Sequence, residues 1–159
     1  MATQDVKAAL PVARLGSGES PIKWSRNRLT FGAASGSIDV ATDIYEIGDI
    51  KAESALVDGY VIVTTVIPTT SSSPTLQFHV GTKTSTNELT AILPMSNIAK
   101  GTTFRFHIGD WLGAAPPTVG IANLYVDADA VLNVTHTGAL PASGAIDVYW
   151  ATIDIQDNT

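Results

Sequence analysis

Short runs in which apolar and polar residues alternate make up most of the chain from residue 28 onward. In the run 37–47, for example, Ile38, Val40 and Ile44 share one parity, while Asp39 and Asp43 take the other. Alternation with a period of two is typical of a β-strand with one face buried. Turn-forming residues separate the runs, and the pattern predicts about eight strands, at 28–32, 37–47, 55–67, 75–81, 103–109, 118–128, 130–137 and 145–155.

The run 55–67 differs from the others because it is apolar at both parities. Val61 and Val63 lie on one face, while Tyr60 and Ile62 lie on the other. We therefore expect this strand to be covered on both faces, either in the centre of a sandwich or against a partner.

The last run, 145–155, changes parity partway along its length. Val148 and Trp150 share a face, but Ile153 falls on the opposite one. The change predicts a β-bulge near Ala151, or a second face buried by a neighbour.

One segment, 85–94, is predicted to form a short helix. Thr86 or Asn87 can cap its N-terminus, Glu88 suits the first turn, and Pro94 ends it. The chain as a whole is predicted to be all-β, an antiparallel two-sheet β-sandwich of the jelly-roll type. An immunoglobulin-like sandwich is the alternative, although its Cys–Trp–Cys signature is missing.

The N-terminal residues 1–27 read as an extended basic arm, ahead of a sandwich domain at 28–159. Pro11, Pro21 and the "GSGESP" cluster interrupt any long element. The first 28 residues carry five Lys or Arg against two acids, whereas the rest carries four against thirteen. A basic arm on an acidic body could dock on an acidic neighbour or remain a solvated tail, and both readings stay open. The candidate partner-binding residues are Lys7, Arg14, Lys23, Trp24, Arg26 and Arg28.

Composition narrows the functional classes. Only 15% of the residues are charged and 45% are hydrophobic, so the surface either consists largely of Thr, Ser, Ala and Gly or is partly buried against other subunits. The absence of cysteine excludes disulfides and thiolate metal sites. No apolar run reaches the roughly 20 residues of a membrane helix, and no secretory signal is apparent. Sparse basic residues argue against nucleic-acid binding. We expect a protein that is made and assembled inside a cell.

Two similar heptapeptides, 75–81 and 103–109, place His79 and His107 at the same position. Strand parity puts each histidine on the polar face, opposite phenylalanines such as Phe78. Two histidines are too few for a tight zinc site, and no acid lies in either strand to complete one. We predict no metal and no cofactor, and we expect both histidines on the surface or at a subunit interface.

Motifs for catalysis are weak. Ser20–Lys23 matches Ser-x-x-Lys, but it lies in the arm and lacks the companion motifs. The segment 32–36 misses the Gly-x-Ser-x-Gly spacing by one residue. Asp127 and Asp129 read as an acidic turn rather than a calcium loop. We predict no catalytic residue and no enzymatic activity.

The order of elements from 38 to 155 resembles that of jelly-roll capsid decoration (cement) proteins of tailed bacteriophages. The resemblance is carried by the stretches "IYEIGDI", "VDGYVIVTT" and "HVGT", a short Glu/Leu/Ala helix, and "GAIDVYWATI". It implies a homotrimer on the outer surface of the capsid, assembled in the host cytoplasm, that bridges neighbouring major capsid subunits. No individual functional residue is carried over.

Three other classes stay open. A neck or tail protein of a virion would have similar composition. A carbohydrate-binding sandwich would need exposed aromatic residues, for which Trp111, Tyr125 and Trp150 are the candidates. A cupin-like enzyme is disfavoured because its His-x-His and Glu ligands are missing.

Overall fold

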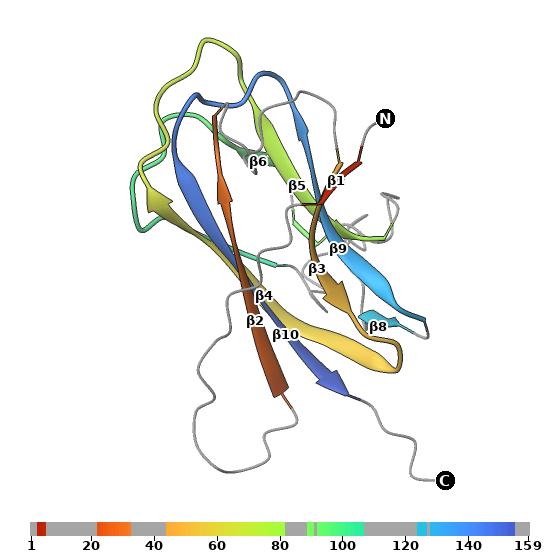
Figure 1. The fold of residues 1–159 in the computed structure, drawn as a ribbon. Helices are drawn as coiled ribbons and strands as arrows, with labels where there is room; N and C mark the ends of the chain where they lie inside the picture. The colour runs from red at the N-terminus through yellow and green to blue at the C-terminus, as the bar shows by residue number, and fades with distance from the viewer. Residues whose placement is uncertain are drawn as a thin grey trace, which may run out of the picture.

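The structure is a computed structural model that describes residues 3–5, 22–32, 44–81, 89–90, 92–106, 124–126 and 128–154. The described residues form two β-sheets that pack face to face, and they include no helix (Figure 1). The strands are β1 (Thr3–Asp5), β2 (Ile22–Thr30), β3 (Ile44–Ile50), β4 (Ser54–Thr65), β5 (Thr75–Val80), β6 (Leu93–Pro94), β7 (Thr103–Arg105), β8 (Leu124–Val126), β9 (Ala130–Thr137) and β10 (Ala145–Asp154).

The strand order is that of a jelly roll. One sheet has the order β2-β10-β4-β7, and the other contains β3-β9-β5-β6. Within these eight strands the pairing is nested, since β2 pairs with β10, β3 with β9, β4 with β7, and β5 with β6, all antiparallel. β1 adds a short parallel strand beside β3, and β8 pairs with β4. The all-β sandwich prediction is therefore confirmed, and the order selects the jelly roll over the immunoglobulin-like alternative.

The core lies between the sheets and is built from the inward parity of each strand. Trp150 on β10 is 2% exposed and packs over the backbone of β3 at Gly48. The β3–β9 register skips Ile47, whose carbonyl oxygen accepts a hydrogen bond from the buried Asn27 side chain at 2.8 Å. This bond joins β2 of one sheet to β3 of the other. The jelly roll is thus held by apolar packing and by one buried polar link between layers.

The predicted change of parity near Ala151 is present as a shift in strand register. Ala151 pairs with Asp58, but the next residue, Thr152, pairs with Leu56. The extra residue is therefore Val57 on β4, and β10 keeps a regular register with β2. The prediction therefore gave the right position along the sheet, but it placed the bulge on β10 instead of on β4. Because of the shift Leu56 is buried whereas Val57 is 37% exposed.

The prediction of a helix over 85–94 was wrong for its described residues. Leu89 donates its backbone N–H to the carbonyl of Phe78, and Leu93–Pro94 forms β6 beside β5. Hydrogen bonds to β5 replace the intrahelical ones, and burial of Leu89 and Leu93 in the core favours the extended path. Residues 82–88 and 91 lie outside the described part of the chain.

The prediction of irregular structure through residue 27 was also wrong in part. β2 begins at Ile22, and its nine residues pair in continuous register with β10. Residues 22–27 are extended because β10 is an antiparallel partner for the whole of β2. It supplies backbone hydrogen bonds and side-chain contacts that local propensity does not include. Lys7 and Arg14 lie outside the described residues. No helix in the described part of the chain is long and apolar enough to cross a membrane.

Candidate interaction face

The outer face of the β2-β10-β4-β7 sheet carries the most distinctive side chains. Arg26, Tyr149, Tyr60 and Arg105 are neighbours in register across its four strands. Strand parity turns this row away from the core, because the adjacent residues Val61 and Val148 are buried. We call this surface the interaction face. It comprises Trp24, Arg26, Arg28, Asp58, Tyr60, Ile62, Arg105, Asp147 and Tyr149, with Ile22 and Val57 at its lower end, where β2 begins and β10 ends (Figure 1).

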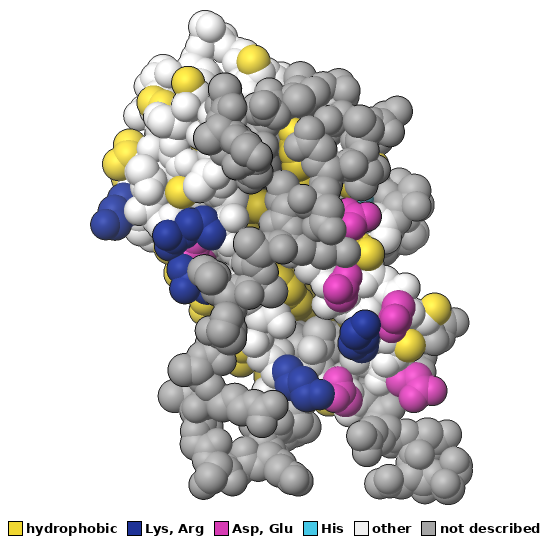
Figure 2. Space-filling model, viewed as in Figure 1, with side chains coloured by type: hydrophobic (Ala, Val, Ile, Leu, Met, Phe, Trp, Pro, Cys, Tyr) yellow, Lys and Arg dark blue, Asp and Glu magenta, His cyan; other side chains and the backbone are white. Residues whose placement is uncertain are grey.

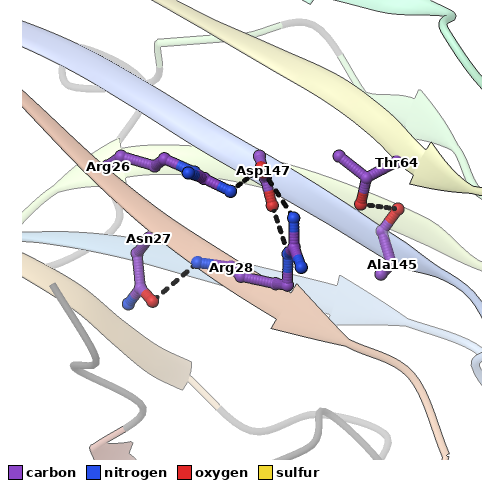
Figure 3. A network of polar contacts seen from close by, with 6 residues as sticks. All are labelled: Arg26, Asn27, Arg28, Thr64, Ala145 and Asp147. Carbon is purple, nitrogen blue, oxygen red and sulfur yellow. Dashed lines mark hydrogen bonds and ion pairs between the residues drawn. The ribbon is translucent and has the colours of Figure 1, made fainter. Parts of the chain in front are cut away.

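Two arginines on β2 share one carboxylate on β10. Nη2 of Arg26 donates to Asp147 at 2.5 Å, while Nε and Nη2 of Arg28 donate to it at 2.7 and 3.1 Å (Figure 3). The Asp147 side chain is only 3% exposed, but those of Arg26 and Arg28 are 27% and 47% exposed. Burial alone would raise the pKa of Asp147, but the hydrogen bonds from Arg28 and Arg26 outweigh it and hold that pKa below its usual range. The carboxylate stays ionised and accepts a bidentate pair.

Three aromatic rings lie next to this arginine pair. The rings of Tyr60 and Tyr149 stack with centroids 4.8 Å apart, and Trp24 lies 5.7 Å from Tyr60. The Arg26 guanidinium lies 5.6 Å from the centre of the Tyr149 ring, within the range of a cation–π contact. Burial raises the pKa of Tyr60, with smaller contributions from Tyr149 and Asp58. Aromatic rings and arginine together are typical of protein–protein interfaces.

Exposed apolar side chains gather at the lower end of the same face. Five large hydrophobic residues are exposed in the described part of the chain, and three of them, Ile22, Trp24 and Val57, lie here. They come from neighbouring positions, because Trp24 and Asp58 both pair with Ala151. A clustered patch of this kind marks an interaction surface more often than a scattered one does.

Acidic residues collect at a different place, around the turn from β3 to β4. Asp49, Glu53 and Asp129 are exposed here, with Lys51 as the basic residue among them. Asp129 accepts the backbone N–H of Ala52 at 2.9 Å, which, together with Lys51, lowers the pKa of Asp129. We call this the acidic end. Figure 2 shows acidic side chains mainly on the right of the molecule and most of the basic ones on the left.

The histidines play a different part from the one predicted. His79 is on the polar side of β5, but that side is covered, and the residue is 0% exposed. Its Nδ1 donates to the carbonyl oxygen of Gly81, which also accepts Asn133 Nδ2, both at 2.9 Å. The prediction of a surface or interface position was therefore wrong for His79. His136 is buried against the Tyr45 ring, and His107 lies outside the described residues.

Four of the six predicted partner-binding residues lie in the described part of the chain, whereas Lys7 and Arg14 lie outside it. Lys23, Trp24, Arg26 and Arg28 belong to β2 of the sandwich rather than to an arm. Lys23 pairs with Asp154, and Arg26 and Arg28 pair with Asp147, so the three basic side chains meet acids of their own chain. Sequence reasoning missed Asp147, Tyr60, Tyr149 and Arg105. A lone acid within the apolar run "AIDVYW" was the available signal, because a buried carboxylate needs a cationic partner.

The structure also bears on the candidates for sugar binding and for metal binding. Trp150 belongs to the core and is closed to a sugar ligand. Trp111 and the side chain of Tyr125 are outside the described part. Within the described residues, no three His, Cys, Asp or Glu side chains are grouped as metal ligands.

The described residues therefore form a jelly-roll β-sandwich with arginine and aromatic side chains on the outer face of one sheet. Comparison with solved structures finds the same fold in two bacteriophage particles. A chain of the capsid of Ralstonia phage GP4 aligns over 98% of this chain and 100% of its own length, with a TM-score of 0.55 and 15% identity. A chain of the acidic stable capsid structure of Helicobacter pylori bacteriophage KHP30 aligns over 84% and 89%, with a TM-score of 0.52 and 11% identity. No family model and no curated protein matches the sequence.

Proposed function

We propose that this chain is a structural component of a bacteriophage capsid, where it decorates the outer surface as a homotrimer and bridges neighbouring major capsid subunits. One observation carries the proposal: the likeness to the GP4 capsid chain extends over both chains almost completely. The alignment takes in the full length of that chain, so the likeness is not confined to one part of it.

The surface chemistry supports a role in contacts rather than in catalysis. The interaction face offers rings, guanidinium groups and an apolar patch, which contribute to association through burial and charge-assisted hydrogen bonds. Each contact can be weak, because many copies bound to one shell act together. On this proposal no covalent bond is made or broken, and no cofactor takes part.

The test is a count of copies in the particle. In purified virions of the phage that encodes this chain, quantitative mass spectrometry should find it in a stoichiometric ratio to the major capsid protein. Cryo-electron microscopy should place it on the outer shell at every equivalent junction. A few copies confined to one vertex would assign it to the neck or tail, and its absence from the particle would refute a structural role.

We further propose that Lys7 and Arg14, ahead of β2, take part in shell binding through their charge. The double variant Lys7→Glu/Arg14→Glu is expected to reduce occupancy on shells that lack the protein, because attraction to an acidic neighbour becomes repulsion. Pelleting of added protein with such shells measures the occupancy. Lys100→Glu, on the turn before β7, is the control for a change of charge alone. Equal binding by all of these variants would exclude the two residues from the contact.

A further inference from the structure

We propose that the interaction face binds the acidic end of a second copy of this chain, so that copies associate head to tail. The inference rests on the proposal that copies assemble, and it adds which two surfaces meet. The two surfaces are distinct parts of one molecule, built from different strands and turns.

The first argument is the composition of the face. Exposed Ile22, Trp24 and Val57 adjoin the stacked tyrosines and the arginine pair. Tryptophan, tyrosine and arginine are the residue types that most often dominate the binding energy at interfaces. Single exposed hydrophobic residues are common on protein surfaces. Here, however, three of the five large hydrophobic residues that are exposed in the described part of the chain are concentrated on one face.

The second argument is the charge that remains on the face after its internal pairs are counted. Arg26 and Arg28 share the single carboxylate of Asp147, and Arg105 pairs with Asp58. Among the residues of this face one positive charge is therefore left over, and the Arg28 side chain is 47% exposed. Each guanidinium has five N–H donors, so Arg28 can donate hydrogen bonds to a second carboxylate while it remains bound to Asp147.

The third argument is that the chain itself carries the complementary surface. At the acidic end Glu53 and Asp129 stand against Lys51, which leaves a net negative charge at the exposed, described positions of these turns. Two interaction faces, both positive, would repel each other, which disfavours a symmetric face-to-face dimer. Contact between two different surfaces is heterologous and generates a closed ring when the rotation allows it. This geometry agrees with a trimer.

Paired charge variants test the inference. Trp24→Glu places a negative charge in the patch and is expected to convert the assembly into monomers of 16.6 kDa, as measured by light scattering after gel filtration. Glu53→Lys should weaken assembly by itself, and Trp24→Glu/Glu53→Lys should regain it because the charges become complementary again. Ile92→Glu is the matched control, since Ile92 is 63% exposed and lies before β6 in the other sheet. Thermal unfolding shows that each variant is folded.

Three results would overturn the inference. They are a wild-type chain that stays monomeric at all concentrations, a Trp24→Glu variant with the wild-type mass, and a double variant with no recovery. A monomer that still binds phage shells would remove the head-to-tail contact and leave the proposed function standing. A stable ring that binds no shell and is absent from virions would refute the proposed function and leave the head-to-tail contact standing.

Discussion

Replacing Gly48 with alanine is expected to destabilise the sandwich by about 1–3 kcal/mol, the usual cost of overpacking a core. A Cβ at this position would lie 2.7 Å from Cη2 of Trp150 and nearer still to Cζ2. The indole cannot move aside easily, because Trp150 is 2% exposed and lies on a central strand between β2 and β4. Urea unfolding followed by circular dichroism measures the loss.

A second substitution identifies the cause. Trp150→Phe removes the ring atoms that the new Cβ would meet, so Gly48→Ala should cost less in that background than in the wild type. The double-mutant cycle should therefore be non-additive, as for residues in direct contact. If Gly48→Ala left the free energy of unfolding unchanged, the close packing of β3 on Trp150 would be contradicted.

Replacing Asp147 with alanine is expected to cost about 1–3 kcal/mol, the range for leaving a buried polar partner unsatisfied. The change removes the shared acceptor of Arg26 and Arg28 and leaves two guanidinium groups facing each other. Their partial exposure to water keeps the loss below that of a fully buried pair. Asp154→Ala is the control, because its pair with Lys23 is exposed and should contribute at most about 1 kcal/mol. Equal losses in the two variants would contradict the role of burial.

The same network predicts how stability depends on pH. The pKa of Asp147 is lower in the folded protein than its ordinary value of about 3.9. The stabilisation is therefore complete above pH of about 4 and is lost as the pH falls through the lower folded pKa. Asp147→Asn should make the free energy of unfolding less dependent on pH in this acidic range. If the free energy of unfolding of that variant still fell with pH as steeply as in the wild type, other carboxylates would be responsible for the acid dependence.

The periodicity of the sequence was enough to predict the class of fold. Parity places Val148 and Trp150 on one face of their strand, and both residues are buried. This prediction succeeds because side-chain direction in a strand depends only on residue number and on which face is dry. The register also shifts near Ala151, but the extra residue is Val57 on β4, so the bulge predicted in β10 lies on the neighbouring strand. The likeness to phage capsid chains agrees with the resemblance seen in the sequence, at the level of fold.

Tertiary structure decided what local pattern could not. Strand β2 starts at Ile22 because β10 offers a complete partner, and Leu93–Pro94 is extended because β5 takes its hydrogen bonds. His79 is buried although it lies on the strand face that carries Thr75 and Gln77. The interaction face joins residues more than a hundred positions apart, such as Arg28 and Asp147. Nested pairing brings β2 and β10 together, so these contacts depend on strand order, whereas alternation along one strand records only which side faces the core.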